Sequence, residues 1–144
     1  KVVSTSAYSP VGKDTVLLLH PKMINQYSGS YTFEGATWEM KNGKKDTNTA
    51  SVITTLRNAT AMNSSTIRLF NKVVAEKISN VADFTYNIRV NTDNTLTITP
   101  YDKLGVTGGG GTYNPAKKSF TLWYTIEENG HTYRTEATLT KSNK

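Results

Sequence analysis

Two alternating segments joined by an Asn-Gly pair constrain this fold more than any other feature of the chain. From Phe120 to Ile126, aromatic and aliphatic residues occupy every second position, and the same alternation resumes from Tyr133 to Leu139. Successive side chains of a strand point to opposite faces, and Asn-Gly favours the tight turns that join antiparallel strands. These segments therefore predict a C-terminal hairpin with one buried face. The other parity carries Trp123, which we expect to face solvent.

The same alternation recurs upstream and indicates an antiparallel protein built from strands. Residues 86–90 and 96–98 alternate on either side of a Thr-Asp-Asn turn, which predicts a second hairpin. Helix-forming residues never recur at a sustained 3.6-residue spacing, and only 71–83 could hold a helical turn. We predict an all-β fold of about eight antiparallel strands in a meander that closes into a lipocalin/calycin-like up-and-down barrel, with a two-sheet β-sandwich as the alternative. The remaining strands are predicted at 15–19, 29–40, 50–56 and 65–70.

The predicted strand at 29–40 changes phase in its middle. Tyr31 and Phe33 share one face, whereas Trp38 lies on the other parity. A strand that keeps pairing through such a switch needs a bulge or a sharp bend, and Gly35 is where the backbone would tolerate one. A bend of this kind also suits the corners of a closed barrel.

Two further predictions concern the residues that reach the core and the loops between strands. We expect Val52 and Leu56 to point inward from their strand, and Ile67 and Leu69 to do so from the next one. The glycine run at 108–111 has no following Lys-Ser/Thr and opens no helix, so it is not a phosphate-binding loop. We interpret it as a flexible connector between strands.

Length and composition indicate a single domain without disulfide bonds. At 144 residues the chain has the common size of a single core, and its lack of cysteine excludes a disulfide framework and thiolate metal sites. We expect residues 1–28 to be a lead-in or linker with one short strand, and residues 29–144 to be the barrel domain. Because the chain begins with Lys1 rather than Met, we expect it to be a fragment of a longer protein. Lysines in turns and at the ends account for the net charge of +6 and mainly favour solubility.

No pattern in the sequence specifies a reaction, so we predict a protein that is not an enzyme and needs no cofactor or metal. His20 and His131 have no Cys, Ser or Asp arranged beside them as a catalytic triad would require. Glu34 and Glu39 flank the predicted bend and could converge, but nothing else in the sequence demands glycosidase chemistry. The basic residues are dispersed and no aromatic RNA-binding motif is present, which argues against nucleic acid as a partner.

Aromatic residues make carbohydrate binding the leading functional hypothesis. Sugar rings pack their C–H faces on tryptophan and tyrosine, while polar side chains satisfy their hydroxyl groups. An outward tryptophan in a strand raises the question of a ligand, and the flexible connector is bordered by two tyrosines. The competing interpretation is that both tryptophans cap the core or pack on a neighbouring domain. The predicted ligand-binding residues are Trp123, Trp38, Tyr101, Tyr113 and Arg134.

Three segments resemble a known family. They are NQYSGSYTFEG at 25–35, ADFTYNIRVNTDNTLTITPYD at 82–102 and GGGTYNPAKKSFTLWYTIEENGHTYRTEATLTK at 109–141. The shared elements are a Tyr-Ser-Gly-Ser-Tyr opening, a Tyr-Asn-Pro before a long strand, and a closing Tyr-x-x-Glu-x-x-Leu. In these elements the chain is similar to the C-terminal domains of unknown function in Bacteroidetes cell-surface lipoproteins associated with glycan utilisation.

This resemblance implies a non-catalytic accessory domain of the cell envelope, at the outer-membrane surface or in the periplasm, that contributes to glycan binding. Its partners would be an oligosaccharide or polysaccharide and a preceding domain or outer-membrane import complex. It would reach the membrane only through a lipid anchor outside this chain. Two alternatives remain open: a structural or protein-interaction module, and a lipocalin-like carrier whose small residues leave room for an apolar ligand. Those small residues are Gly35, Ala36, Ala50 and Ala137.

Overall fold

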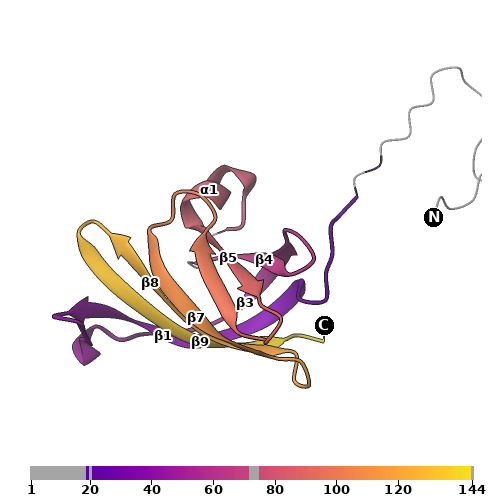
Figure 1. The fold of residues 1–144 in the computed structure, drawn as a ribbon. Helices are drawn as coiled ribbons and strands as arrows, with labels where there is room; N and C mark the ends of the chain where they lie inside the picture. Colours follow the sequence, from indigo (N-terminus) through magenta and orange to yellow (C-terminus); the bar gives the residue numbers. More distant parts are fainter. Residues whose placement is uncertain (1–18, 20, 72–74, 144) are drawn as a thin grey trace, which may run out of the picture.

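The computed structural model describes residues 19, 21–71 and 75–143, so the strand predicted at 15–19 lies outside the described residues except for Leu19. The described chain is all-β with one short helix, as predicted (Figure 1). The elements in chain order are β1 (Gly29–Lys41), β2 (Lys44–Lys45), the 3₁₀ turn η2 (Thr47–Thr49), β3 (Ser51–Ala61), β4 (Thr66–Phe70), the 3₁₀ turn η3 (Ile78–Asn80), α1 (Val81–Phe84), β5 (Thr85–Val90), β6 (Leu96–Pro100), β7 (Val106–Asn114), β8 (Ser119–Glu128) and β9 (His131–Lys141).

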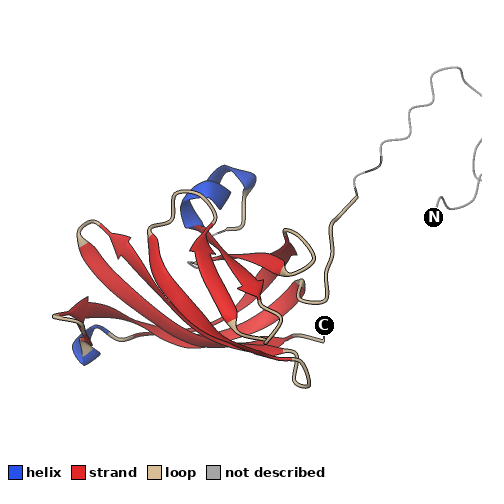
Figure 2. Cartoon of the chain, in the orientation of Figure 1, coloured by secondary structure: helices blue, strands red, loops and turns tan. Residues whose placement is uncertain are grey.

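The strands form one antiparallel sheet that curls into a nearly closed barrel (Figure 2). Its order is β6-β5-β4-β3-β1-β9-β8-β7, with β2 paired to β1 outside this path. Each main strand lies beside its neighbour in the sequence, and β9 returns to pair with β1. The two end strands meet through a bridge between Thr95 and Thr112 and a 2.8 Å hydrogen bond from the Tyr113 amide to the Asn94 carbonyl. The up-and-down barrel is therefore confirmed over the sandwich alternative.

The C-terminal hairpin has the predicted turn and the predicted buried face. Asn129 and Gly130 both adopt positive φ angles, 53° and 79°, as the tight turn between β8 and β9 requires. The inward positions of β8 are at most 4% exposed, and Leu139 on β9 is fully buried. Ile67 and Leu69 on β4 are also fully buried, as predicted. The inward residues of β8 are Phe120, Leu122, Tyr124 and Ile126.

Aromatic side chains fill one end of the barrel. The rings of Tyr27 and Tyr113 lie 4.9 Å apart in an edge-to-face contact, and Phe120 packs 4.8 Å from Tyr113 and 5.5 Å from Tyr31. Asn25 also attaches the chain before β1 to the β3–β4 turn, because its side-chain amide donates to the carbonyls of Asn63 and Thr66. The last residues of the predicted lead-in thus pack against the barrel.

The strand predicted at 50–56 is present as β3, but the prediction that Val52 and Leu56 point inward was wrong. Val52 and Leu56 are 80% and 64% exposed. The register places Val52 opposite Ala36 and Leu56 opposite Thr32, on the outer face of β1. The inward parity of β3 instead carries a buried arginine, Arg57, so the apolar residues did not mark the core face of this strand.

A bulge or a sharp bend was predicted in β1 at Gly35, and no bulge interrupts the strand there. Pairing runs without interruption from Gly29 to Thr37 along β3 and from Tyr31 to Met40 along β9. Because side chains alternate along a regular strand, Glu34 and Glu39 point to opposite faces and do not converge. Gly35 serves a different purpose: an added Cβ would lie 2.4 Å from the Glu136 carbonyl oxygen, so glycine permits a close approach of β1 to β9.

The glycine run is not a connector but the central part of β7. Gly108 to Gly111 pair in register with Thr125 to Leu122 of β8, after an irregularity between Val106 and Gly108. A Cβ on Gly109 would lie 2.8 Å from the Cβ of Ile98 in β6. The missing side chains therefore let β7 approach β6 where the barrel closes, which is why a sequence that resembles a linker forms a strand here.

Candidate functional site

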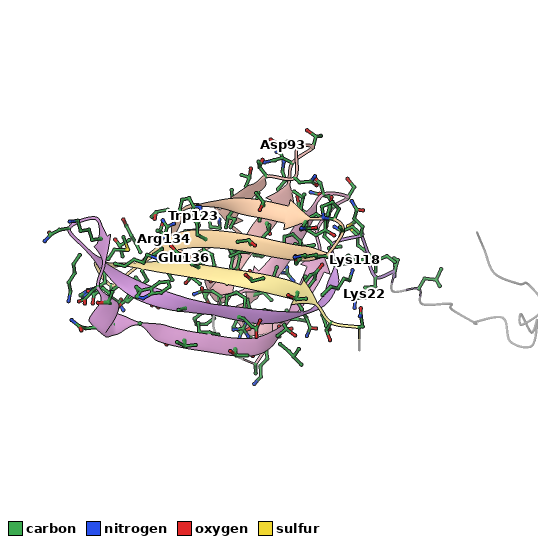
Figure 3. All side chains as sticks on the ribbon, turned by 90° about the horizontal axis from the view of Figure 1, so that it is seen from below. Lys22, Asp93, Lys118, Trp123, Arg134 and Glu136 are labelled. Carbon is green, nitrogen blue, oxygen red and sulfur yellow. The ribbon has the colours of Figure 1, made fainter. Side chains whose placement is uncertain are left out.

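The outer face of three adjacent strands brings two tryptophans close to an ion pair. Strand β9 lies between β1 and β8, and the register sets Arg134 opposite Trp38 of β1 and Glu136 opposite Trp123 of β8. All four residues occupy the parity that faces away from the core. Figure 3 shows Trp123, Arg134 and Glu136 side by side on the outside of the barrel. We call these four residues, together with Lys45 of β2, the two-tryptophan face.

Charged side chains hold both indole rings in place. Arg134 Cζ lies 4.2 Å from the ring centre of Trp123, and Lys45 Nζ lies 4.4 Å from that of Trp38, which are cation–π distances. The carboxylate of Glu136 joins the two cations, because Arg134 Nε donates to Oε1 at 2.8 Å and Lys45 Nζ to Oε2 at 2.8 Å. The hydrogen bond from Lys45, followed by that from Arg134, lowers the pKa of Glu136 below its ordinary value. Glu136 is therefore ionised at neutral pH.

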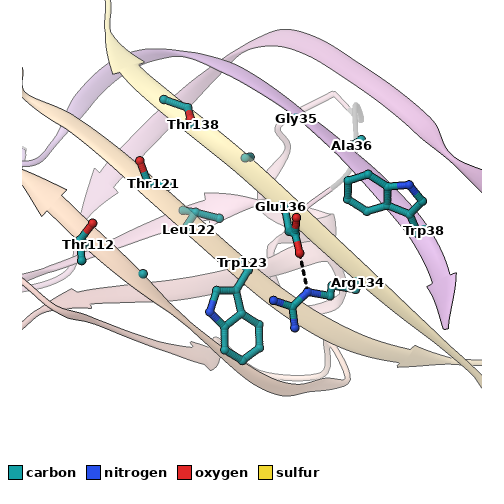
Figure 4. A pocket seen from close by; sticks show the side chains of 12 residues that line it. Gly35, Ala36, Trp38, Thr112, Thr121, Leu122, Trp123, Arg134, Glu136 and Thr138 are labelled. Atoms are coloured by element: carbon teal, nitrogen blue, oxygen red, sulfur yellow. Dashed lines mark hydrogen bonds and ion pairs between the residues drawn. The ribbon is translucent and has the colours of Figure 1, made fainter. Parts of the chain in front are cut away.

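A shallow hollow of about 590 Å³ lies over this face (Figure 4). Trp38 and Trp123 stand on opposite sides of the Arg134–Glu136 pair. Threonine side chains from β7, β8 and β9 also line the hollow. These hydroxyls belong to Thr112, Thr121 and Thr138.

The predicted ligand-binding residues fall into three places. Trp38, Trp123 and Arg134 come together on the two-tryptophan face. Tyr113 is 8% exposed and belongs to the aromatic cluster inside the barrel. Tyr101 is 39% exposed and lies elsewhere, with Arg68 Cζ 4.7 Å from its ring centre. The binding role of all five residues stays a prediction.

Sequence reasoning missed two members of the face, Glu136 and Lys45. Glu136 follows Arg134 by two positions, so the alternation that places Arg134 outward places Glu136 beside it, and this signal was available. Lys45 carried no such signal. It reaches the face only because β2 folds back on β1 through a turn at Asn42 and Gly43.

The histidine of the C-terminal hairpin pairs with a carboxylate outside this face. His131 Nδ1 lies 2.7 Å from Glu39 Oε1 at the exposed end of β1 and β9. Among the described residues, no group of three or more His, Asp or Glu side chains could hold a metal ion. His20 lies outside the described part of the chain. No helix in the part of the chain seen here has the length and apolar character needed to cross a bilayer.

The chain is a small antiparallel barrel domain. Its outer face carries two tryptophans whose cation–π partners share one carboxylate. A family model described as "-like, C-terminal" matches residues 15–140, and the chain belongs to this family of C-terminal domains. The prediction of a C-terminal domain is thereby confirmed. No curated protein matches the chain.

Solved structures of Bacteroides proteins share the fold. A multidomain protein including DUF1735 from Bacteroides ovatus aligns over 81% of this chain and 57% of its own, with 19% identity and a TM-score of 0.59. A second Bacteroides ovatus protein of unknown function aligns over 81% and 48%, with 18% identity and a TM-score of 0.57. The chain thus spans about half the length of these structures. An auxiliary nutrient binding protein from Bacteroides thetaiotaomicron aligns over 81% and 46%, with 18% identity and a TM-score of 0.49.

Proposed function

We propose that this chain is a non-catalytic accessory domain of a cell-envelope lipoprotein and that its two-tryptophan face binds glycans. The observation that carries the proposal is the pair of outward indoles on either side of an ion pair, on a face built from adjacent strands. Indole rings offer apolar surface for the C–H groups of a sugar ring. Arg134 donates hydrogen bonds and Glu136 accepts them, so both kinds of hydroxyl contact are available between the rings.

The two cations hold the side chains of this face in place before any ligand binds. Arg134 and Lys45 each lie over an indole and share the carboxylate of Glu136, so the rings need little ordering when a ligand arrives. Less conformational entropy is lost on binding to a surface whose side chains are already fixed. The shallow hollow and its threonine hydroxyls favour an extended oligosaccharide or polysaccharide over a small compact molecule.

The family and the greater length of the solved structures that share the fold support the proposed location and partners. Membership in a C-terminal family and a fold shared with longer Bacteroides proteins support a preceding domain in the same polypeptide. The resemblance to cell-surface lipoproteins supports a position at the outer-membrane surface or in the periplasm. A lipid anchor and an outer-membrane import complex would then lie outside this chain.

The carrier of an apolar ligand is less well supported. Of the four small residues that were to leave room inside the barrel, Ala36 faces outward and Ala50 is exposed. Gly35 and Ala137 approach so closely that a Cβ on Gly35 would lie 2.6 Å from the Cβ of Ala137. Aromatic rings occupy the barrel end beyond them.

A glycan array followed by isothermal titration calorimetry tests the proposal. We expect binding to at least one host or plant polysaccharide, weakened about tenfold or more by Trp123→Ala and by Trp38→Ala, as for central aromatic contacts. Tyr101→Ala is the matched control, because Tyr101 is also an exposed aromatic stacked by an arginine but lies outside the face. No binding across the array, or binding that both tryptophan variants retain, would refute the proposal.

The structural-module alternative makes a different prediction for the longer protein. If a preceding domain covers the face, acrylamide should quench tryptophan fluorescence less in the longer protein than in this domain alone. If the face binds glycans, quenching should be equal in the two and should fall when the polysaccharide is added.

A further inference from the structure

The segment that leads into β1 exposes several large apolar side chains. Seven large apolar residues of the described chain are exposed, and three of them lie between positions 19 and 24: Leu19 at 76%, Met23 at 56% and Ile24 at 76%. Leu56, 64% exposed on the outer face of β3, is a fourth. Single exposed apolar residues are ordinary on a soluble protein, whereas a group of them in one place marks a contact surface.

A hollow of about 320 Å³ lies beside these side chains. Its lining combines residues 22–25 with the start of β1 and the end of β3. Asn58 belongs to this lining and follows Leu56 by two positions, so the two side chains share the outer face of β3. Among the described residues of the lining, only Lys22 carries a charge. We call Met23, Ile24, Leu56 and this hollow the lead-in surface.

Hydrogen bonds fix the lead-in surface on the barrel. The side-chain amide of Asn25 donates to two carbonyls of the β3–β4 turn, and its Oδ1 accepts from the amides of Tyr27 and Ser28 at 2.9 Å and 2.8 Å. From β9, Lys141 Nζ donates to the Gln26 carbonyl at 3.1 Å. Because Asn25 directly follows the exposed apolar residues, these bonds hold the place where the chain enters the barrel.

We infer that the lead-in surface packs against the preceding domain of the same polypeptide, an inference that rests on the proposed function because that domain is part of it. The chain reaches β1 through this surface, so a preceding domain is attached beside it. This chain covers 57% and 48% of the two Bacteroides ovatus proteins that share its fold, which leaves length in such proteins for a second domain. Domains of one chain move relative to each other unless an apolar interface holds them. The exposed apolar side chains favour such an interface, and its other half should be apolar and carry little charge.

The lead-in surface lies far from the two-tryptophan face. Met23 and Ile24 lie beside Gly29 at the start of β1, whereas Trp38 lies nine positions further along the same strand, or about 30 Å at 3.3 Å per residue. Figure 3 shows Lys22 at one end of the barrel and Trp123 away from it, toward the other end. A preceding domain on the lead-in surface would therefore leave the tryptophans open to a ligand.

Oxidation of methionine by hydrogen peroxide tests this contact in the longer protein and in this domain alone. Met23 belongs to the lead-in surface, and Met40 lines a hollow next to Arg134 and Glu136, so native side chains report on both places. Peptide mass spectrometry gives each oxidation rate. We expect Met23 to be oxidised about fivefold or more slowly in the longer protein, because its sulfur is shielded, and Met40 to be unchanged. Equal Met23 rates in the two proteins would overturn the inference, and so would protection of Met40 alone, because the preceding domain would then cover the two-tryptophan face.

Ile24→Ser and Leu56→Ser show whether the apolar contacts are responsible. In the longer protein each should speed the oxidation of Met23, whereas in the domain alone each should change little because both positions are exposed. Ile78→Ser is the matched control, because Ile78 is 96% exposed but lines a different hollow. If Met23 stays as protected in both variants as in the parent, the inference fails. Glycan binding is measured on the domain alone, so failure of this contact and failure of the two-tryptophan face are seen separately.

Discussion

Replacing Gly35 by alanine should destabilise the barrel, although the backbone there can accept a side chain. Gly35 does not have the positive φ angle that favours glycine. At such positions Gly→Ala normally stabilises a protein by about 0.4–1 kcal/mol, because the unfolded chain loses freedom. The close approach of β1 to β9 should reverse this sign.

The size of the effect follows from the contacts that the new methyl group would make. An ideal Cβ would lie 2.4 Å from the Glu136 carbonyl oxygen and 2.9 Å from the Ala137 Cα, which are backbone atoms that no rotamer change can move. Carbon–oxygen contacts between strands are normally about 3.3–3.6 Å, so β1 and β9 would have to separate by about 1 Å. Overpacking of this kind typically costs about 1–3 kcal/mol. Subtracting the gain of about 0.4–1 kcal/mol leaves a net loss of up to about 2.6 kcal/mol, or up to roughly 10 °C in the thermal midpoint of a domain of this size.

Thermal unfolding followed by circular dichroism measures this loss, with Gly108→Ala as the control. A Cβ on Gly108 would meet only Thr125 Oγ1, at 3.6 Å, which is an ordinary contact. Gly108→Ala should therefore leave the midpoint unchanged or raise it slightly. A midpoint for Gly35→Ala at or above that of the parent would refute the close approach. Adding Ala137→Gly to Gly35→Ala should recover only part of the loss, since the contact with the Glu136 carbonyl remains.

Three other perturbations have expected outcomes. In urea unfolding, Ile67→Ala should cost about 2–5 kcal/mol because Ile67 is fully buried, whereas Val52→Ala at an 80% exposed position should change stability by less than about 0.5 kcal/mol. Because the pKa of Glu136 is lowered in the folded protein, its ionised carboxylate stabilises the fold above pH 4.5, the pKa in the unfolded chain. This stability is lost as the pH falls through the folded pKa. Glu136→Gln should therefore weaken the dependence of the thermal midpoint on pH in the acid range. The raised pKa of Tyr124, about 12, contributes stability below pH 10.0 that is lost as pH rises toward 12; absorbance at alkaline pH should therefore show Tyr124 ionising late, and a normal titration in the folded protein would contradict its burial.

The alternation of apolar and polar residues was sufficient to predict the barrel. It did not predict for every strand which side points into the core. In β8 and β9 the apolar residues other than Trp123 share one parity, so the inward side was unambiguous. In β3 the two largest exposed aliphatic residues, Val52 and Leu56, lie on the outer parity, and Arg57 lies on the inner one. Only the pairing of β3 with β1 decides this orientation, and that pairing depends on residues distant in the sequence.

The glycine run shows a second limit of sequence reasoning. Four consecutive glycines lack both strand propensity and side-chain pattern, so their local preference is for an irregular loop. Their conformation in β7 is set by the neighbours on each side. Ile98 of β6 and Tyr124 of β8 leave no room for a Cβ on Gly109, whose added Cβ would lie 2.8 Å and 3.0 Å from theirs.

The two-tryptophan face and the barrel interior use opposite faces of the same strands, and the alternation keeps them chemically separate. On β9, Arg134 and Glu136 face outward, whereas Thr135 is buried inside the barrel. A substitution on one face should leave the other face intact, except where the two share a constrained backbone. The Glu136 carbonyl is such a place, because it contacts Gly35 while the side chain of the same residue joins both cations of the two-tryptophan face. The tight packing of β1 on β9 therefore fixes the position of the carboxylate on which that face depends.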